Sequence, residues 1–279
     1  MKVCSNNKQI AEVVSIWKSQ GKTIALVPTM GGLHAGHLSL VHQAKENADK
    51  VIVSIFVNPT QFGEHEDFEN YPKTLDQDLS ELEACAVDAV FTPDKKQIYP
   101  DGFKSPLKAG SLSQGLCGNS RPGHFDGVVQ VVNCLFKITK PDVAIFGQKD
   151  YQQLLVIEQM VKALALPIKI LSGDIVREKN GLAMSTRNQY LSMDERDLAT
   201  NLYKVLKDLK KEILQDKEIE QARLNSNRAL EQHFKIEYLS VLDANTLKSI
   251  ADNTNKIAIL CSVFLGSTRL IDNIIFNKG

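Results

Sequence analysis

Short runs of apolar, mostly β-branched residues alternate with amphipathic stretches through roughly the first 175 residues of the chain. Continuous apolar strands that alternate with helices are typical of a parallel sheet covered on both faces. The pattern therefore predicts an α/β fold built on a doubly wound parallel sheet. The predicted strands are TIALV (23–27), VIVSIFV (51–57), DAVFTP (88–93), DVAIFG (142–147) and IKILSG (168–173).

The pattern changes from Asp194 onward. Two charged helical stretches, 194–216 and 218–233, are followed by the strand-like segments YLSVL, IAILCSVF and RLIDNIIF, which predicts a second, smaller α+β domain. A turn at Lys179-Asn180-Gly181 precedes this change. We expect one domain over residues 1–177 and the smaller domain over residues 178–279.

Composition excludes several classes of protein. The chain is 43% hydrophobic with a formal net charge of zero, so no global field would attract it to nucleic acid or to an anionic membrane. Its apolar runs are too short to cross a bilayer, and we expect neither nucleic acid nor membrane as a partner. The five cysteines are widely spaced and form no Cys-x-x-Cys pair, which predicts free thiols and a cytoplasmic location.

The segment PTMGGLHAGH (28–37) joins the first predicted strand to a helix through two adjacent glycines and two histidines. Backbone N–H groups at a helix start have no partner within the helix and favour an anion. His34 and His37 lie three apart, so their imidazoles are expected on one side of the first turn, where both can donate to a phosphoryl group. This arrangement indicates a nucleotide site and nucleotidyl transfer.

Two other interpretations apply to these histidines. A histidine near a helix start is often only a cap or a packed side chain, although the combined strand, glycine turn and His-x-Gly-His pattern is more specific than one histidine. Zinc binding is the other interpretation, but no further His or Cys cluster has suitable spacing.

Further polar residues follow the other predicted strands. In a doubly wound sheet they are expected to meet in one crevice beyond the carboxyl ends of the strands. Lys149 suits a polyphosphate, and Asp150 suits Mg²⁺, a ribose hydroxyl or a helix cap. The segment Met184-Ser185-Thr186-Arg187 combines two hydroxyls and a guanidinium, as a phosphate clamp does, but it could also be a capping loop.

Two glutamines and one acidic run are the remaining candidate site residues. Gln61 and Gln153 follow two strands and could bind the hydroxyls of a substrate, or could be ordinary loop glutamines. The run Glu64-His65-Glu66-Asp67 resembles a metal site but is expected to be a solvated acidic loop.

Six motifs together resemble the pantothenate synthetase (pantoate–β-alanine ligase) family. They occur in the family's order across nearly the whole chain: PTMGGLHAGH, FVNPTQF, YPKTLDQDL, GLCGNSRPGHFDGV, FGQKDYQQL and MSTRNQYLS. The resemblance implies a HIGH-motif nucleotidyltransferase with a Rossmann-like N-terminal domain, a C-terminal lid and a homodimeric assembly. It implies that ATP and (R)-pantoate form a bound pantoyl adenylate, from which β-alanine displaces AMP.

The resemblance also implies roles for individual residues. His34, His37, Lys149 and Arg187 are expected to be catalytic. Gln61 and Gln153 are expected to bind pantoate, Gln61 also β-alanine, and Asp150 a Mg²⁺ ion that accompanies ATP. The expected ATP-binding residues are Met30, Gly31, Gly32, Leu33, His34, Ala35, Gly36, His37, Gly147, Gln148, Lys149, Asp150, Val176, Met184, Ser185, Thr186 and Arg187. Asn58, Tyr71, Arg121 and His124 match positions of less defined role.

Two departures from the family pattern stand out. Gln148 replaces a common acid beside Lys149, and Thr186 replaces a frequent serine. Two alternative functions stay open: an adenylyltransferase with a phosphorylated acceptor, and a regulatory nucleotide-binding module without turnover. The neutral amides argue against the first, and the complete set of catalytic motifs argues against the second.

Overall fold

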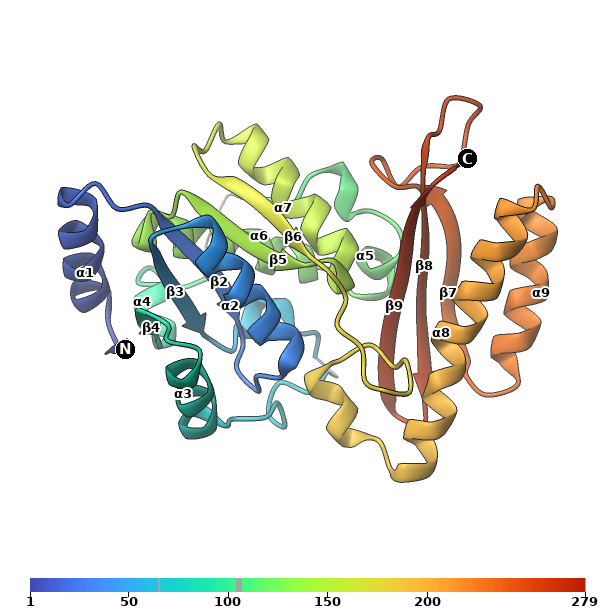
Figure 1. Ribbon diagram of the computed structural model, residues 1–279, viewed down its shortest axis with the longest axis horizontal. Coiled ribbons are helices and arrows are strands. Elements are labelled where there is room, and N and C mark those ends of the chain that lie inside the picture. The colour runs from blue at the N-terminus through green and yellow to red at the C-terminus, as the bar shows by residue number, and fades with distance from the viewer. Residues whose placement is uncertain (65, 104–106, 279) are drawn as a thin grey trace. The chain divides into compact units, whose positions relative to one another are not determined.

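The structure is a computed structural model that describes residues 1–64, 66–103 and 107–278 (Figure 1). The chain forms two compact units. The N-terminal unit comprises Met1–Gln148 and Gln152–Asp174, and the C-terminal unit comprises Lys149–Tyr151 and the chain from Ile175 onward.

The N-terminal unit contains a six-stranded sheet in the order β1-β4-β3-β2-β5-β6, and every neighbouring pair is parallel. Helix α2 packs on β2, β3 and β5, while α6 contacts β2 and α1. This arrangement confirms the predicted α/β fold with a doubly wound sheet. The strands are β1 (Lys2–Cys4), β2 (Ile24–Thr29), β3 (Lys50–Ile55), β4 (Ala89–Phe91), β5 (Val143–Gly147) and β6 (Lys169–Gly173).

Helices connect these strands in the N-terminal unit. They are α1 (Asn7–Ser19), α2 (Ala35–Asn47), α3 (Leu75–Ala84), α4 (Lys95–Ile98), α5 (Cys117–Ser120), α6 (His124–Thr139) and α7 (Tyr151–Ala163). Three 3₁₀ turns lie between them: η1 (Pro59–Gln61), η2 (Ser111–Ser113) and η3 (Gln148–Asp150). The first residue of α7, Tyr151, belongs to the C-terminal unit.

The register of the sheet aligns the ends of two central strands. Thr29, the last residue of β2, pairs with Ile55, the last residue of β3. The loops that follow both strands therefore leave the same edge of the sheet at the same level. This alignment places the glycine–histidine segment beside η1.

The C-terminal unit contains an antiparallel sheet in the order β7-β8-β9 and two long helices, as predicted. A capping box at Ser192 and Glu195 begins the first helix. Apolar residues of the helices and of all three strands form one core, which is centred on Leu202, Leu206 and Ile259. The elements are η4 (Thr186–Tyr190), α8 (Met193–Leu214), α9 (Ile219–Glu231), β7 (Lys235–Asp243), β8 (Lys256–Leu265) and β9 (Thr268–Asn277).

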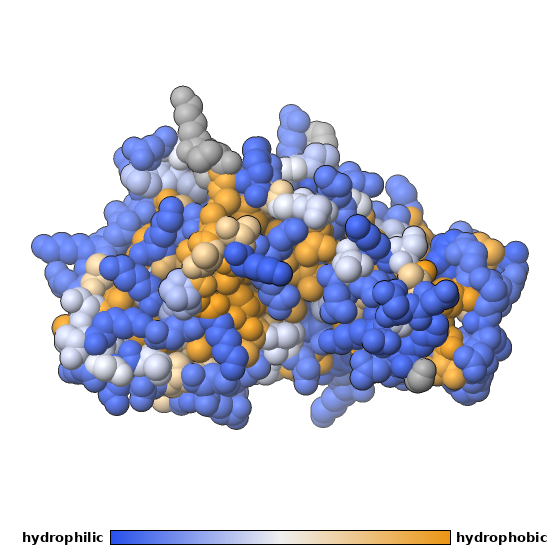
Figure 2. Space-filling view, turned by 90° about the horizontal axis from the view of Figure 1, so that it is seen from above, coloured by the Kyte–Doolittle hydropathy of each residue, from blue (hydrophilic) through white to orange (hydrophobic). Residues whose placement is uncertain are grey.

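The surface is mostly hydrophilic on the face shown in Figure 2, where hydrophobic side chains gather over the N-terminal unit. Among the residues that the structure describes, no helix combines the length and the apolar character that a membrane span requires.

A glycine allows α6 to approach η1 closely. A Cβ atom on Gly127 would lie 2.2 Å from the backbone oxygen of Thr60 and 2.8 Å from the backbone nitrogen of Gln61. The Asn58 amide also donates to the Gly127 carbonyl, at 3.2 Å. The position of Gln61 therefore depends on the missing side chain at residue 127.

We predict that Gly127→Ala lowers the free energy of unfolding by about 1–3 kcal/mol, because backbone atoms of η1 cannot yield as a side chain can. Urea denaturation measures the change. Gly63→Ala is the matched control, since its Cβ would make only ordinary van der Waals contact with the Glu66 side chain, at 3.6 Å. Equal stability of the two variants would contradict the close packing of α6 on η1.

Candidate active site

The segment after β2 turns sharply before α2 begins. Gly31 and Gly32 have φ values of +85° and +63°, in the left-handed region that side chains rarely adopt. His34 is the N-cap residue of α2, so the helix begins at Ala35. The two glycines therefore place His34 and the first turn of α2 at the carboxyl edge of the sheet.

The imidazoles of His34 and His37 lie side by side, as their spacing predicts. Their ring centroids are 4.0 Å apart. The Gly36 N–H donates to Nδ1 of His34 at 3.1 Å, so the proton of the neutral ring sits on Nε2. His34 can therefore donate from Nε2 while Nδ1 caps the helix.

Several backbone N–H groups of this segment, which we expected to face an anion, donate to partners within the protein. The Gly31 N–H donates to the Thr29 hydroxyl at 3.3 Å, and the His37 N–H donates to the His34 carbonyl at 2.8 Å. The N–H groups of Gly32 and Leu33 donate to the carboxylate of Asp78. With the Gly36 N–H on Nδ1 of His34, five N–H groups of this segment have partners within the protein. The imidazoles of His34 and His37 stay candidate donors for a phosphate.

The candidate pantoate residue Gln61 lies beside this loop. Its Nε2 is 2.9 Å from the sulfur of Met30, and its Oε1 accepts from the Asn58 amide at 3.2 Å. Asn58 is 1% exposed and accepts from the Tyr99 hydroxyl at 2.8 Å. Burial raises the pKa of Tyr99 to about 12, so this hydroxyl remains a donor.

The backbone of Gln61 is held by a second set of contacts. Nδ1 of His124 lies 2.7 Å from the Gln61 carbonyl, and Nη2 of Arg121 donates to the same oxygen at 3.2 Å. Nη1 of Arg121 is 3.0 Å from Nε2 of His124. Because a guanidinium can only donate, Nε2 of His124 must accept, and its Nδ1–H donates to Gln61.

The Glu66 carboxylate holds the Arg121 guanidinium in place, so Glu66 is not part of a solvated loop. Its two oxygens accept from Nε and Nη2 of Arg121, each at 2.6 Å. Burial alone would raise the pKa of Glu66, but the hydrogen bonds and charge of Arg121 outweigh it, and the pKa is lowered. The expectation for Glu66 was therefore wrong; His65 lies outside the described residues.

Three candidate residues of the N-terminal unit follow β5. Gly147 ends β5 and pairs with Gly173 of β6, and Gln148 begins η3. Gln153 is half-buried on α7, whereas its neighbour Gln152 is 5% exposed and bonds to the 112–117 segment.

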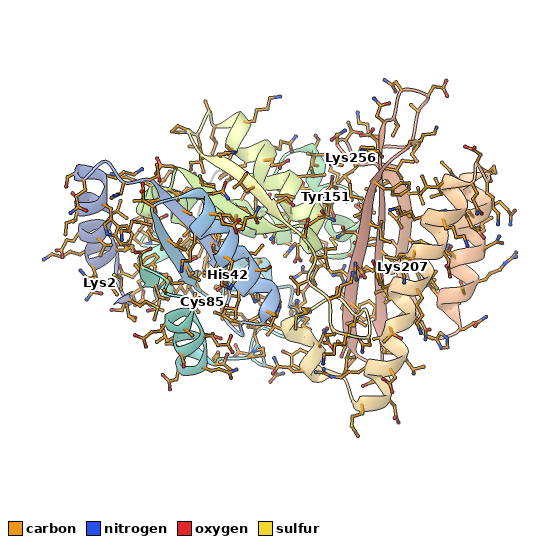
Figure 3. The ribbon with its side chains drawn as sticks, in the orientation of Figure 1. Lys2, His42, Cys85, Tyr151, Lys207 and Lys256 are labelled. Atoms are coloured by element: carbon orange, nitrogen blue, oxygen red, sulfur yellow. The ribbon has the colours of Figure 1, made fainter. Side chains whose placement is uncertain are left out.

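Lys149 and Asp150 belong to the C-terminal unit. Nζ of Lys149 is 3.5 Å from a carboxylate oxygen of Asp150. The Asn273 amide donates to the Lys149 carbonyl at 2.9 Å, and the Tyr151 hydroxyl, labelled in Figure 3, donates to the Ala244 carbonyl at 3.0 Å. The C-terminal unit thus holds the backbone on both sides of Asp150.

The remaining candidates lie on one folded-back segment of the C-terminal unit. The Met184 N–H donates to the Val176 carbonyl at 2.9 Å, which brings these two candidates together. The Ser185 hydroxyl caps η4 by accepting from the Arg187 N–H, and Thr186 is buried. The buried Asn188 amide holds the segment through Glu178 and the Ala183 carbonyl.

A metal ion in the candidate site would be held by a single carboxylate together with ligand atoms. In the described part of the chain, no group of three or more His, Cys, Asp or Glu residues is placed to hold a metal ion. Magnesium in nucleotide sites is commonly held by one or two carboxylates together with substrate phosphates. The Asp150 carboxylate, 49% exposed, has the oxygen chemistry for that arrangement.

Sequence reasoning gave no role to three supporting residues, Asp78, Gly127 and Asn273, although the first two lie within quoted motifs. Asp78 lies in the first turn of α3, where an acid is ordinary and gives no separate signal. Asn273 interrupts an apolar strand, and a buried polar residue in such a run is the signal that could have found it.

The chain is similar to known proteins over nearly its whole length. The family model for pantoate-beta-alanine ligase matches residues 2–275. The pantothenate synthetase of Ruthia magnifica is 60% identical over the whole of both chains, and that of Caldicellulosiruptor saccharolyticus is 47% identical over 99% of both chains.

Solved structures give the same result. The crystal structure of pantothenate synthetase from Thermus thermophilus matches with a TM-score of 0.93 at 36% identity, over 98% of this chain and 99% of that one. Pantoate–β-alanine ligase from Francisella tularensis, complexed with β-γ ATP and β-alanine, matches with a TM-score of 0.83 at 36% identity, over 99% and 97% of the two chains.

We predict that Glu66→Gln destabilises the protein by about 1–3 kcal/mol near neutral pH, because it leaves Arg121 half-buried with a weaker partner. The pKa of Glu66 is lowered in the folded state, so its stabilisation is present above the unfolded pKa of about 4.3 and disappears as pH falls through the folded value. Urea denaturation at several pH values tests this. A difference between wild type and variant that persists unchanged at pH 3 would contradict it.

Proposed function

The chain belongs to the pantoate–β-alanine ligase family, and we propose that it condenses (R)-pantoate with β-alanine in an ATP-dependent reaction. The products are pantothenate, AMP and diphosphate, and the enzyme is a carbon–nitrogen ligase. The observation that carries this proposal best is the pair of adjacent imidazoles at the start of α2, beside the amide of Gln61.

In the first step, a pantoate carboxylate oxygen attacks the α-phosphorus of ATP and the bond to diphosphate breaks. Negative charge builds up on the phosphoryl oxygens, and preorganised donors stabilise it. The Nε2–H of His34 and the ring of His37 supply such donors. Because His34 is held by its Nδ1 bond to Gly36, little reorganisation is needed as the charge develops.

In the second step, the neutral amine of β-alanine attacks the acyl carbon of pantoyl adenylate. A carbon–nitrogen bond forms, the bond to the AMP oxygen breaks, and the amine loses a proton. Holding an activated acyl group beside an amine, away from water, supplies most of the acceleration that this step needs.

In the N-terminal unit, the loop after β2 and neutral amide side chains would bind the substrates. Met30–His37, Gly147 and Gln148 would contact ATP. Gln61 and Gln153 would bind the oxygens of pantoate, and Gln61 would also contact β-alanine. An amide carries two donor hydrogens and two acceptor lone pairs, so Gln61 can bind a substrate while it keeps its contacts to Asn58 and Met30.

The C-terminal unit would supply the charged contacts to ATP. Lys149 and Arg187 would bind the phosphates, the Val176 backbone would contact adenine, and Met184, Ser185 and Thr186 would line the triphosphate. In the proposed domain organisation, residues 178–279 form a lid over the catalytic domain, residues 1–177, and exclude water when substrates are bound. Gln148 beside Lys149 would alter phosphate affinity without changing the reaction.

Magnesium would enter with ATP, and the carboxylate of Asp150 would hold it together with phosphate oxygens. Bound there, the ion would neutralise charge on the leaving diphosphate. No tightly bound organic cofactor is part of the proposal. We further propose that the enzyme is a cytoplasmic homodimer, as the resemblance and the free cysteines suggest.

Release of diphosphate and AMP from ATP and Mg²⁺ tests the function. With pantoate and β-alanine together, we expect sustained turnover; with pantoate alone, a single burst of diphosphate equal to the enzyme concentration. ATP binding without any pantoate-dependent diphosphate would instead favour a regulatory module. Turnover that ends in a stable dinucleotide and needs no amine would favour an adenylyltransferase.

We predict that His37→Ala lowers the rate of the diphosphate burst by roughly 10²–10³-fold, the usual effect of removing one donor to a developing charge. His42→Ala is the matched control, because His42 is an exposed side chain farther along the same helix (Figure 3). Circular dichroism checks that both variants keep their helices. A His37 variant as fast as the His42 variant would refute the assigned role.

A further inference from the structure

Asp78 is a buried carboxylate that binds the glycine loop of the candidate ATP site. It is 1% exposed, although it lies in the first turn of α3. Its Oδ2 accepts from the Gly32 N–H at 3.0 Å, and its Oδ1 accepts from the Leu33 N–H at 2.9 Å and from the Thr74 hydroxyl at 3.2 Å. The three donors are uncharged, so hydrogen bonds from two backbone N–H groups and one hydroxyl compensate the burial of this carboxylate.

The glycine turn is shaped around this carboxylate. A Cβ atom on Gly31 would lie 3.0 Å from Oδ2 of Asp78 and 3.2 Å from Cγ2 of Ile55. With φ at +85° and +63°, Gly31 and Gly32 direct the following N–H groups toward one point, where the carboxylate sits. A concave arrangement of this kind ordinarily binds an anion from solution, and here the protein fills it with its own.

The residue that follows the bound N–H groups is His34. Its direction is set by the path of the backbone through Gly32 and Leu33, and the same path lets Nδ1 of His34 reach the Gly36 N–H. We propose that Asp78 is a positioning residue for the ATP site. It fixes the loop so that His34 caps α2 through Nδ1 and presents Nε2–H to the phosphates.

This inference rests on the proposed use of His34 as a phosphate donor. It adds an acidic residue that touches neither ATP nor the reacting atoms and acts through the backbone. It also means that the N–H groups of Gly32 and Leu33 bind Asp78 and not the phosphates.

The test is Asp78→Asn, which keeps the size of the side chain but replaces one acceptor with an NH₂ group that faces an N–H donor. We expect the dissociation constant for ATP, measured by calorimetry without pantoate, to rise about tenfold or more. In ¹⁵N spectra of the histidine rings, His34 should lose its fixed Nε2–H tautomer. Both readouts are independent of turnover, so they judge Asp78 even if the enzyme shows no pantoate-dependent diphosphate.

Asp88→Asn is the matched control. Asp88 also accepts from a backbone N–H of the sheet, that of Val51 at 2.9 Å, and pairs with Lys50. It directly precedes β4 and binds the amino end of β3, the edge of the sheet opposite the glycine loop. We expect this variant to lose stability while ATP affinity and the His34 tautomer stay as in wild type. If ATP affinity and the His34 tautomer changed equally in both variants, the cause would be general destabilisation, and the proposal would be overturned.

Thr74→Ala is the milder second variant, should Asp78→Asn fail to fold. It removes one of the three hydrogen bonds to Asp78, and the Thr74 side chain makes no capping bond to α3. We expect a smaller weakening of ATP binding in the same direction. Wild-type ATP affinity and an unchanged His34 tautomer in the variant that folds would overturn the proposal.

Discussion

The turn between β2 and α2 requires two successive residues with positive φ, and glycine alone adopts that conformation without strain. Gly31 and Gly32 meet this constraint and wrap the backbone around the carboxylate of Asp78. The pair of imidazoles and the contact between Met30 and Gln61 both lie directly beside this turn. A side chain at Gly31 would displace the carboxylate and, with it, the start of α2.

In the N-terminal unit, backbone groups hold the loops in place, and side chains are the candidate ligand contacts. The N–H groups of Gly32 and Leu33 hold Asp78, and the carbonyl of Gln61 accepts from Arg121 and His124. The backbone thus anchors the loops to Asp78, Arg121 and His124, side chains that are themselves hydrogen-bonded. The candidate ligand-binding side chains beside these loops are imidazoles and amides, and the His34 ring and the Gln61 amide are each oriented by hydrogen bonds within the protein.

Local patterns in the sequence predicted five of the six strands in the parallel sheet, because each of the five contains a short apolar run, which is buried in β2 to β5 and partly exposed in β6. They missed β1, three residues at the edge of the sheet whose Val3 is 47% exposed. Hydrophobic spacing also predicted that the loops after β2 and β3 share one edge. It could not show that Asp78 binds residues 45 and 46 positions earlier, or that Glu66 pairs with Arg121, because such contacts form only when distant segments fold together.

The candidate phosphate contacts in the two units differ in charge. In the N-terminal unit, Asp78 is bound by neutral donors and Glu66 is paired with Arg121, so these groups offer no unpaired positive charge to a triphosphate. Neutral imidazoles can orient a phosphoryl group and stabilise charge as it develops, but they contribute little long-range attraction. Lys149 and Arg187, the cationic residues among the proposed ATP contacts, both belong to the C-terminal unit.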